Sequence, residues 1–178
     1  MPAETKEHLE RDCGIKTYVQ WEKHVKEADD IFWNQRFRVY GQWREAEWAR
    51  YQKYGFVEGY MGCRCYGPMS FTECANRCIQ GSGFHVLLQA LTWDVEDFER
   101  EHLQSRIIGQ IHDAIVVLVK DEELERVKEI LYHNGVTRVM EKFKWIHVPL
   151  VIEADISESG GSWASMPYSE ALGPKVAA

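Results

Sequence analysis

One His-Asp pair, His112-Asp113, stands between two short apolar runs and has the residue types needed for metal chemistry. The first run covers residues 106–111, and the second, residues 114–119, is rich in β-branched residues. This pattern predicts a tight β-hairpin with the pair in its loop. A carboxylate held between two strands is well placed to bind a divalent cation, so Asp113 is the candidate metal ligand. Taken alone, however, a His-Asp pair at a turn is more often simple turn chemistry.

Asn76 lies in a short helix that is predicted to run from a capping box at Ser70 to about Arg77, and a second amide residue, Gln80, follows four positions later. Asn and Gln near a glycine are ordinarily helix caps. The glycines within residues 80–83 are expected to interrupt or loosen the helix. The apolar spacing of a buried helical face then follows over residues 84–91.

The charge of the chain is unevenly distributed. The total is −7, but residues 36–80 hold seven Lys/Arg and four Asp/Glu, so this stretch is +3 and the remainder is −10. A basic stretch on an acidic body can bind phosphates, and Arg64 and Arg77 belong to it. Charge alone favours the simpler interpretation, a solvated helix face.

Composition narrows the class of protein. The 178 residues, 45% hydrophobic and 28% charged, suit one domain of ordinary size. No apolar stretch reaches membrane-spanning length and the first residues do not resemble a signal peptide, so we expect a cytoplasmic protein without a membrane partner. The cysteines are odd in number, and neither Cys63-x-Cys65 nor Cys74-x-x-x-Cys78 has zinc-ribbon spacing. We expect reduced, structural thiols.

The chain is predicted to be an α+β protein, with an antiparallel sheet built around the His-Asp hairpin and helices packed on one side. Residues 1–54 are expected to be helical, with a long helix from Thr17 bent near Tyr40-Gly41. Their many aromatic residues should pack in a core, while some face an interface. Residues 55–156 form the sheet-bearing region, and residues 157–178 a loose tail.

Several short elements, in order, resemble the C-terminal palm of family A (polymerase I-like) DNA polymerases. The resemblance runs from about residue 14 to Trp163. The matching elements are Gly-Phe-Val-Glu at 55–58, Gly-Cys-Arg-Cys at 62–65, Asn-x-x-x-Gln-Gly at 76–81, His-Asp at 112–113, Val-Pro-Leu at 148–150 and Gly-Ser-Trp at 161–163. Each element is modest alone, but their order and spacing together are specific.

The resemblance implies a role for each candidate residue. Nucleotide addition in the family is a phosphoryl transfer that uses two Mg²⁺ ions. The resemblance implies that Asp113 and His112 are catalytic, with Asp113 binding the metal and His112 contacting the primer end. It also implies minor-groove contacts for Asn76 and Gln80, and phosphate contacts for Arg64 and Arg77. The implied partners are primer-template DNA and dNTPs.

The sequence also departs from the family pattern. Ala114 stands where a second carboxylate, Glu, is common. The other departures are Phe84-His85 in place of Ala-Asp, Leu88 in place of Lys, and Cys63 and Cys65 in place of Arg. Variants of this kind resemble those of bacteriophage polymerases. For a viral protein, the expected location is the host cytoplasm.

Two family elements are not recognisable, namely the motif A aspartate and the motif B fingers helix. One carboxylate cannot hold two metals. We therefore expect this chain to be one piece of a split polymerase, a hetero-oligomer with a Mg²⁺ site shared between chains. An upstream polymerase fragment would supply the thumb, the fingers, motif A and any 3′–5′ exonuclease.

Two other functions stay open. A non-catalytic, palm-derived DNA-binding or scaffolding subunit is one, and Ala114 is its best support. The other is a stand-alone metal-dependent nuclease or phosphotransferase that pairs Asp113 with Asp94, Asp97 or Asp155.

Overall fold

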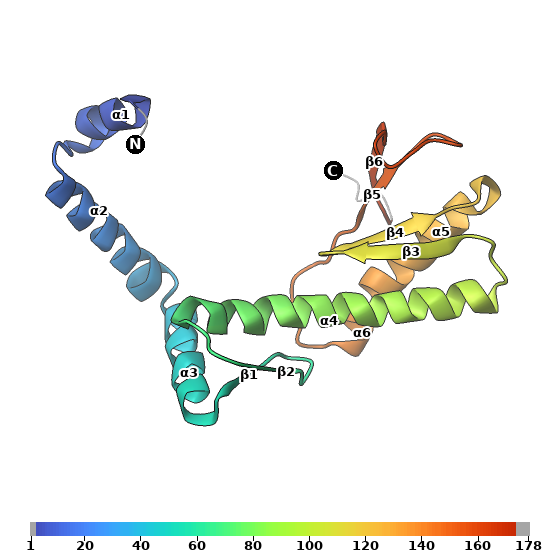
Figure 1. The fold of residues 1–178 in the computed structure, drawn as a ribbon, viewed down its shortest axis with the longest axis horizontal. Helices are drawn as coiled ribbons and strands as arrows, with labels where there is room; N and C mark the ends of the chain where they lie inside the picture. The colour runs from blue at the N-terminus through green and yellow to red at the C-terminus, as the bar shows by residue number, and fades with distance from the viewer. Residues whose placement is uncertain (1–2, 174–178) are drawn as a thin grey trace. The chain divides into compact units, whose positions relative to one another are not determined.

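The computed structural model describes residues 3–173, which divide into two compact units. The first unit contains the residues up to Glu58 and the segment Arg64–Cys78, and the second contains Gly59–Cys63 and the residues from Ile79 onward. Helices and small antiparallel strand pairs alternate along the chain (Figure 1), so the predicted α+β class is confirmed. The three regions predicted from the sequence stay a prediction.

The first unit begins with four consecutive helical segments. They are α1 (Ala3–Cys13), α2 (Tyr18–Asp30), the π-helical η1 (Ile31–Arg36) and α3 (Arg38–Tyr54). A capping box at Thr17 starts α2. The expected bend near Gly41 is wrong, because the helix breaks at Phe37, where φ is −118° and ψ is 40°. Gly41 stays helical, and a Cβ there would lie 2.7 Å from the Trp33 carbonyl oxygen, so its glycine serves close packing.

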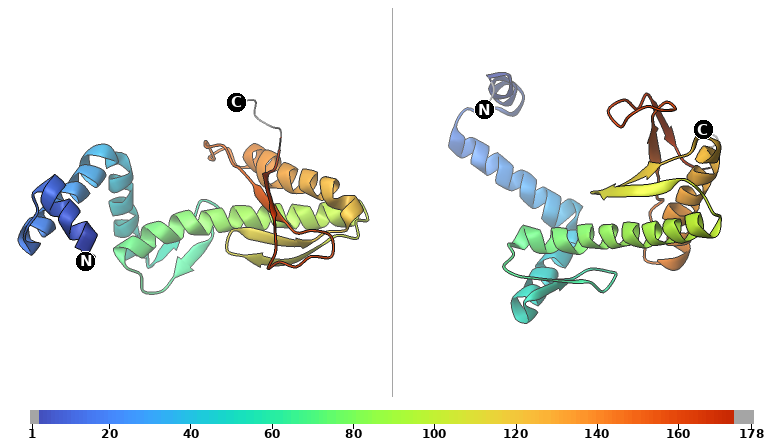
Figure 2. Two further views of the ribbon diagram at one scale, coloured as in Figure 1. Left: turned by 90° about the horizontal axis from the view of Figure 1, so that it is seen from above. Right: turned by 45° about the vertical axis from the view of Figure 1, so that its right-hand side comes forward.

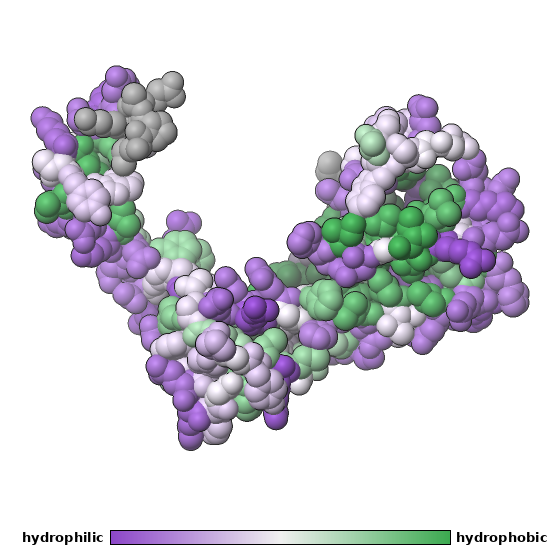
Figure 3. Space-filling model, viewed as in Figure 1, coloured by the Kyte–Doolittle hydropathy of each residue, from purple (hydrophilic) through white to green (hydrophobic). Residues whose placement is uncertain are grey.

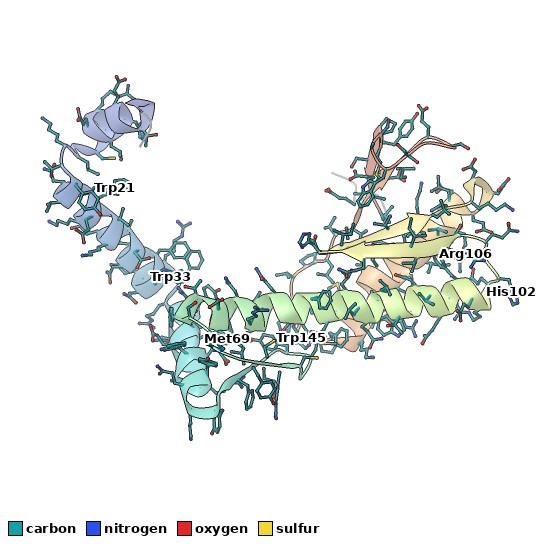
Figure 4. The ribbon with its side chains drawn as sticks, viewed as in Figure 1. Trp21, Trp33, Met69, His102, Arg106 and Trp145 are labelled. Atoms are coloured by element: carbon teal, nitrogen blue, oxygen red, sulfur yellow. The ribbon has the colours of Figure 1, made fainter. Side chains whose placement is uncertain are left out.

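A short hairpin completes the first unit. Strand β1 (Phe56–Glu58) pairs antiparallel with β2 (Arg64–Tyr66). Val57, Cys74 and Cys78 are buried, and the residues packed around them are Trp43, Trp48, Tyr51 and Met69, the last labelled in Figure 4. The prediction that the aromatic residues pack in a core therefore holds for Trp43, Trp48 and Tyr51. In α2, η1 and α3 themselves no described residue is fully buried.

Helix α4 (Phe71–Arg100) runs for 30 residues without interruption. Its predicted cap is confirmed, since the Glu73 carboxylate accepts from the Ser70 amide at 2.8 Å and the Glu73 amide donates to the Ser70 hydroxyl. The predicted interruption at residues 80–83 is wrong. A glycine in a helix costs about 1 kcal/mol relative to Ala, and the burial of Trp93 and Phe98 further along outweighs it.

The second unit packs helices against a hairpin. Strand β3 (Arg106–Ile111) pairs with β4 (Ala114–Leu118), and then follow the 3₁₀ turn η2 (Asp121–Glu123), α5 (Leu124–Tyr132), the π-helical η3 (His133–Arg138) and α6 (Val139–Lys142). In both views of Figure 2 the strand pair and α5 lie alongside the second half of α4. Phe98, Val127 and Ile130 form the buried centre of this layer, with Ile107 and Val117 against it.

A second cluster of the same unit holds the residues after α6 in place. Ala90 and Trp93 of α4 pack on Val139 and Phe143. Trp145, labelled in Figure 4, stacks on Tyr60 with ring centroids 5.1 Å apart. The chain therefore returns across α4 before it enters its last strands.

The last strands correct two expectations. Strand β5 (Glu153–Ile156) pairs antiparallel with β6 (Tyr168–Ala171), so the region beyond residue 157 is not a loose tail as far as residue 173. The described residues form three separate two-stranded sheets rather than one sheet around the hairpin. Backbone pairing and the ion pair of Lys128 with Glu170, at 2.6 Å, hold β6 although it shows no alternating burial. Residues 174–178 of the predicted tail lie outside the described residues.

No helix in the described part of the chain combines the length and the apolar character needed to cross a membrane.

Candidate functional site

His112 and Asp113 form the two-residue loop that joins β3 to β4. The strand register places Ile111 opposite Ala114, so the pair occupies the whole turn. Both residues are exposed. Hydrophobic packing of the strand pair on the α4 and α5 core therefore anchors the base of the hairpin while its loop faces outward.

The loop has an unusual backbone conformation. His112 has a φ of 53°, which L residues other than Asn, Asp and His rarely adopt. Hairpin turns of the primed types require a positive φ at the first loop position. The Gln110 side-chain amide donates to the His112 carbonyl oxygen, which fixes this turn from within the hairpin. His102 has a similar φ of 55°, so the positive φ of His112 is accounted for by the hairpin turn and leaves the candidate assignment a prediction.

Asn76, Arg77 and Gln80 are exposed on helix α4. Cys74 and Cys78 point into the core of the first unit, so Asn76 and Gln80, four residues apart, occupy the solvent side of the helix. This spacing puts two amide groups one turn apart. The described residues show no hydrogen bond or ion pair from Gln80 to the loop pair.

Arg64 is already partnered in the first unit. Its Nε lies 2.5 Å from Glu58 Oε2 across the β1–β2 hairpin, and its guanidinium covers the Phe56 ring at 4.5 Å. The hydrogen bond from Arg64 holds the pKa of Glu58 below its ordinary value. An anionic ligand of Arg64 must therefore compete with a carboxylate for the same guanidinium.

The other acidic residues considered for a metal site have a structural role. Asp94 and Asp97 are buried, 1% and 4% exposed, and the Asn134 side-chain amide donates to both at 3.0 and 2.9 Å. Arg100 lies 2.7 Å from Asp97 Oδ1. Burial raises the pKa of Asp94 to about 7. These carboxylates stabilise the joint between α4 and η3.

The residues present do not complete a metal site. Mg²⁺ takes oxygen ligands in octahedral geometry and is usually held by one or two carboxylates and by substrate phosphates. The loop offers the Asp113 carboxylate, and Ala114 beside it has no donor atom. Within residues 3–173 no group of three or more His, Cys, Asp or Glu is arranged to hold a metal ion. Asp94 and Asp97, buried and bonded to Asn134, are not free to pair with the exposed Asp113. The pairing of Asp113 with Asp155 stays a prediction.

Residues 25–165, which include the hairpin loop and the exposed face of α4, match the DNA polymerase family A. This chain belongs to that family. DNA polymerase I of Aquifex aeolicus (strain VF5) is 27% identical over 124 residues, which are 68% of this chain. DNA polymerase I of Caldicellulosiruptor bescii is 34% identical over 88 residues, which are 49% of this chain.

A solved structure shares the fold of this family A chain. It is the POL domain of Pol1 from M. smegmatis in complex with DNA primer-template and dNTP, with a TM-score of 0.55, 20% identity and 72% of this chain covered. The family A chain spans 21% of the length of the Aquifex relative and 24% of the length of this solved chain.

Sequence reasoning missed three residues that hold the candidate residues in place. Gln110 sets the turn, Glu58 neutralises Arg64, and Asn134 joins the two buried aspartates. The role of Gln110 could have been predicted, because a side chain two residues before His112 can form a hydrogen bond to the loop backbone. The partner of Glu58, Arg64, lies six residues away, and the partner of Asn134, Asp94, lies forty residues away. No local sequence pattern predicts either pair.

Proposed function

We propose that this chain is the C-terminal, palm-bearing piece of a DNA-directed DNA polymerase that works in DNA replication, split from the rest of the enzyme. The observation that carries the proposal is the family A match over residues 25–165, within which His112-Asp113 falls in the exposed two-residue loop of a core-anchored hairpin. By itself, the chain holds only a part of the site for template-directed nucleotidyl transfer.

Asp113 is proposed as this chain's ligand to Mg²⁺, and His112 as its contact with the primer end. A Mg²⁺ ion bound there supplies charge stabilisation to the reacting phosphate oxygens. The remaining ligands, including the motif A carboxylate, are proposed to come from the upstream polymerase fragment, since the described residues hold no group of three or more His, Cys, Asp or Glu arranged for a metal ion. The Gln110 bond to the His112 carbonyl keeps the loop in one conformation before substrate arrives.

Asn76 and Gln80 are proposed to contact the minor groove of primer-template DNA. Amide donors there meet the base acceptors N3 and O2 in an almost sequence-independent way, which suits a polymerase that copies every sequence. Arg77 and Arg64 are proposed to contact phosphates. Because Arg64 is paired with Glu58, its phosphate contact requires the guanidinium to exchange partners.

A second polymerase chain is proposed to cover the apolar faces of this one. The outer face of the β3–β4 pair exposes Ile108 and Leu118, each at 63%, and Ile111 at 43%. Figure 3 shows hydrophobic residues gathered over these strands. A two-stranded sheet with apolar residues on both faces exposes one apolar face to water unless another element covers it. The proposed covering chain is an upstream fragment that carries the thumb, the fingers, motif A and any 3′–5′ exonuclease.

The aromatic side chains of the first unit are proposed to form a further apolar contact with the upstream fragment. Phe32, Phe37 and Tyr40 remain 43%, 42% and 37% exposed although they stack with one another and with Trp33. Trp33 and Trp21 are labelled in Figure 4. Ala114 and Phe84-His85 support the bacteriophage-type part of the proposal.

Primer extension tests the proposal. With Mg²⁺ and all four dNTPs, we expect no extension by this chain alone and none by the upstream fragment alone. The two chains together should extend the primer. Equal extension by the upstream fragment without this chain would overturn the catalytic assignment.

A scaffolding role without catalysis is the second candidate, and Ala114 favours it because the loop keeps only one carboxylate. This role predicts that the two-chain complex binds primer-template DNA yet never extends it. It also predicts that replacement of Asp113 leaves every measured property of the complex unchanged.

A further inference from the structure

Two glycines, Gly81 and Gly83, stand inside α4, where glycine weakens a helix. Other glycines of the chain have a reason within the fold, since a Cβ at Gly135 would lie 2.5 Å from Ile152 Cδ1. A Cβ built at Gly81 or Gly83 meets nothing within 4 Å. Neither adopts the positive φ that favours glycine. Within the described residues, nothing requires these positions to lack a side chain.

An aromatic side chain lies directly beside this bare stretch of helix. Phe84 is 43% exposed, and its ring meets His85 edge-on with centroids 5.6 Å apart. His85 Nδ1 lies 2.6 Å from the Gly81 carbonyl oxygen, which turns the imidazole back onto the helix. Gln80 is exposed one turn before Phe84. The exposed surface here therefore combines an amide group, open backbone and a ring.

We propose that Gln80, Gly83 and Phe84 form a close-contact surface for the minor groove of a nucleic-acid duplex. Gly83 admits the sugar-phosphate backbone close to the helix, and Phe84 packs its ring against sugars and base edges. Apolar side chains that enter the minor groove contact base steps in other minor-groove proteins, which is the precedent for Phe84 here. The inference rests on the proposed function, which assigns the minor-groove contact of Gln80, and adds two residues to it.

Nucleic acid is favoured over a protein partner by the neighbouring side chains. Arg77 is exposed three residues before Gln80, and the spacing of Arg77, Gln80 and Phe84 places them on one side of a helix. A cation, an amide donor and a ring in this order meet the phosphates, base acceptors and sugars of a duplex. The Gly83 and Phe84 contacts carry no charge, so they should not contribute to the salt dependence of binding.

The test is fluorescence anisotropy with the full chain and a fluorescein-labelled primer-template at several salt concentrations. Phe84→Ala should raise the dissociation constant roughly tenfold, and Phe84→Leu by less, with the salt slope unchanged. Gly83→Ala should also weaken binding severalfold while it raises Tm by about 2 °C, because alanine stabilises a helix that has room for it. Higher stability with weaker binding is a combination that a purely structural glycine would not produce.

Matched controls lie on the same helix. Val95→Ala removes an exposed apolar side chain of similar exposure, 38%, and Thr92→Ala raises helix propensity at another exposed position. Both should leave DNA affinity unchanged. If Gln80→Ala weakens binding while the Gly83 and Phe84 variants do not, this inference is wrong and the proposed function stands.

Two further results would also overturn the inference. Wild-type chain that fails to bind primer-template even at low salt would remove both this surface and the DNA contacts of the proposed function. Phe84→Ala that weakens assembly with the upstream fragment, but leaves DNA affinity intact, would make this face a protein interface.

Discussion

The second unit holds its carboxylates in two opposite environments. Asp113 stands in an exposed loop, whereas Asp94 is 1% exposed and bonded to Asn134. A buried carboxylate must be neutral or paired, and the amide of Asn134 serves two at once. An exposed carboxylate keeps its charge and its coordination capacity for a ligand. The difference shows that burial commits Asp94 to the fold, whereas the exposed Asp113 is left accessible to a ligand.

The largest expected effect concerns the exposed carboxylate. In the two-chain complex, Asp113→Ala should lower the single-turnover rate of primer extension by about 10³-fold or more, because a metal ligand is lost. Asp155→Ala, another exposed aspartate of the unit, should leave the rate within about twofold. The comparison breaks if the two variants lose activity equally. Neither change should alter Tm, since neither side chain is buried.

The buried carboxylates should respond in the opposite way. Asn134→Ala leaves Asp94 and Asp97 without their shared donor, and should lower the free energy of unfolding by roughly 4 kcal/mol near pH 7.5. Urea unfolding measures the loss. Ser159→Ala removes an exposed partner of Asp121 and serves as the control, with an expected change below about 0.5 kcal/mol. A loss of that small size for Asn134→Ala would mean that the cluster contributes nothing to folding.

The pH dependence of stability sharpens the same contrast. The pKa of Asp94 is about 7 in the folded chain, whereas its ordinary value, which applies to the unfolded chain, is 3.8. The unfolded state therefore binds fewer protons between these values, and stability should fall as pH rises from about 4 to about 7. The loss should be roughly 3 kcal/mol, and Asp94→Asn should flatten it. Equal profiles for wild type and variant would show that Asp94 does not titrate in this range.

A third environment gives the smallest effect. Glu58, in the first unit, is neither free nor buried but paired with Arg64. Glu58→Gln should release the guanidinium and strengthen DNA binding a few-fold at low salt, with a salt slope steeper by about one. Glu96→Gln, an exposed site on α4, removes the same charge without releasing an arginine. If both variants gain the same DNA affinity, the change in net charge explains the effect and the release of Arg64 does not.

Local patterns were enough to predict much of the fold. The Ser70 capping box and the helical class of residues 3–54 follow from neighbours in the sequence, and the structure confirms them. The uninterrupted α4 could not be predicted, because the packing of Trp93 and Phe98 that outweighs its glycines is tertiary. Strand β6 has no periodic apolar signal, and its pairing with β5 depends on residues about fifteen positions away.

The candidate site stays a prediction, and the sequence could indicate only the part of it that local spacing defines. His112-Asp113 and the Asn76 and Gln80 spacing are readable because the residues that define them are adjacent or one helical turn apart. Asp94 was considered as a metal ligand because the sequence does not reveal burial. Asn134, about forty residues further on, decides its role.

The most direct test of the central claim is a change of metal preference at Asp113. In the two-chain complex, Asp113→Cys should be nearly inactive in primer extension with Mg²⁺, because a thiolate is a poor ligand for a hard cation. A thiophilic ion such as Cd²⁺ should restore part of the activity, relative to wild type in the same metal. Asp155→Cys should show no such dependence. Equal losses in both metals, or full activity with Mg²⁺, would contradict the assignment of Asp113 as the metal ligand that this chain contributes.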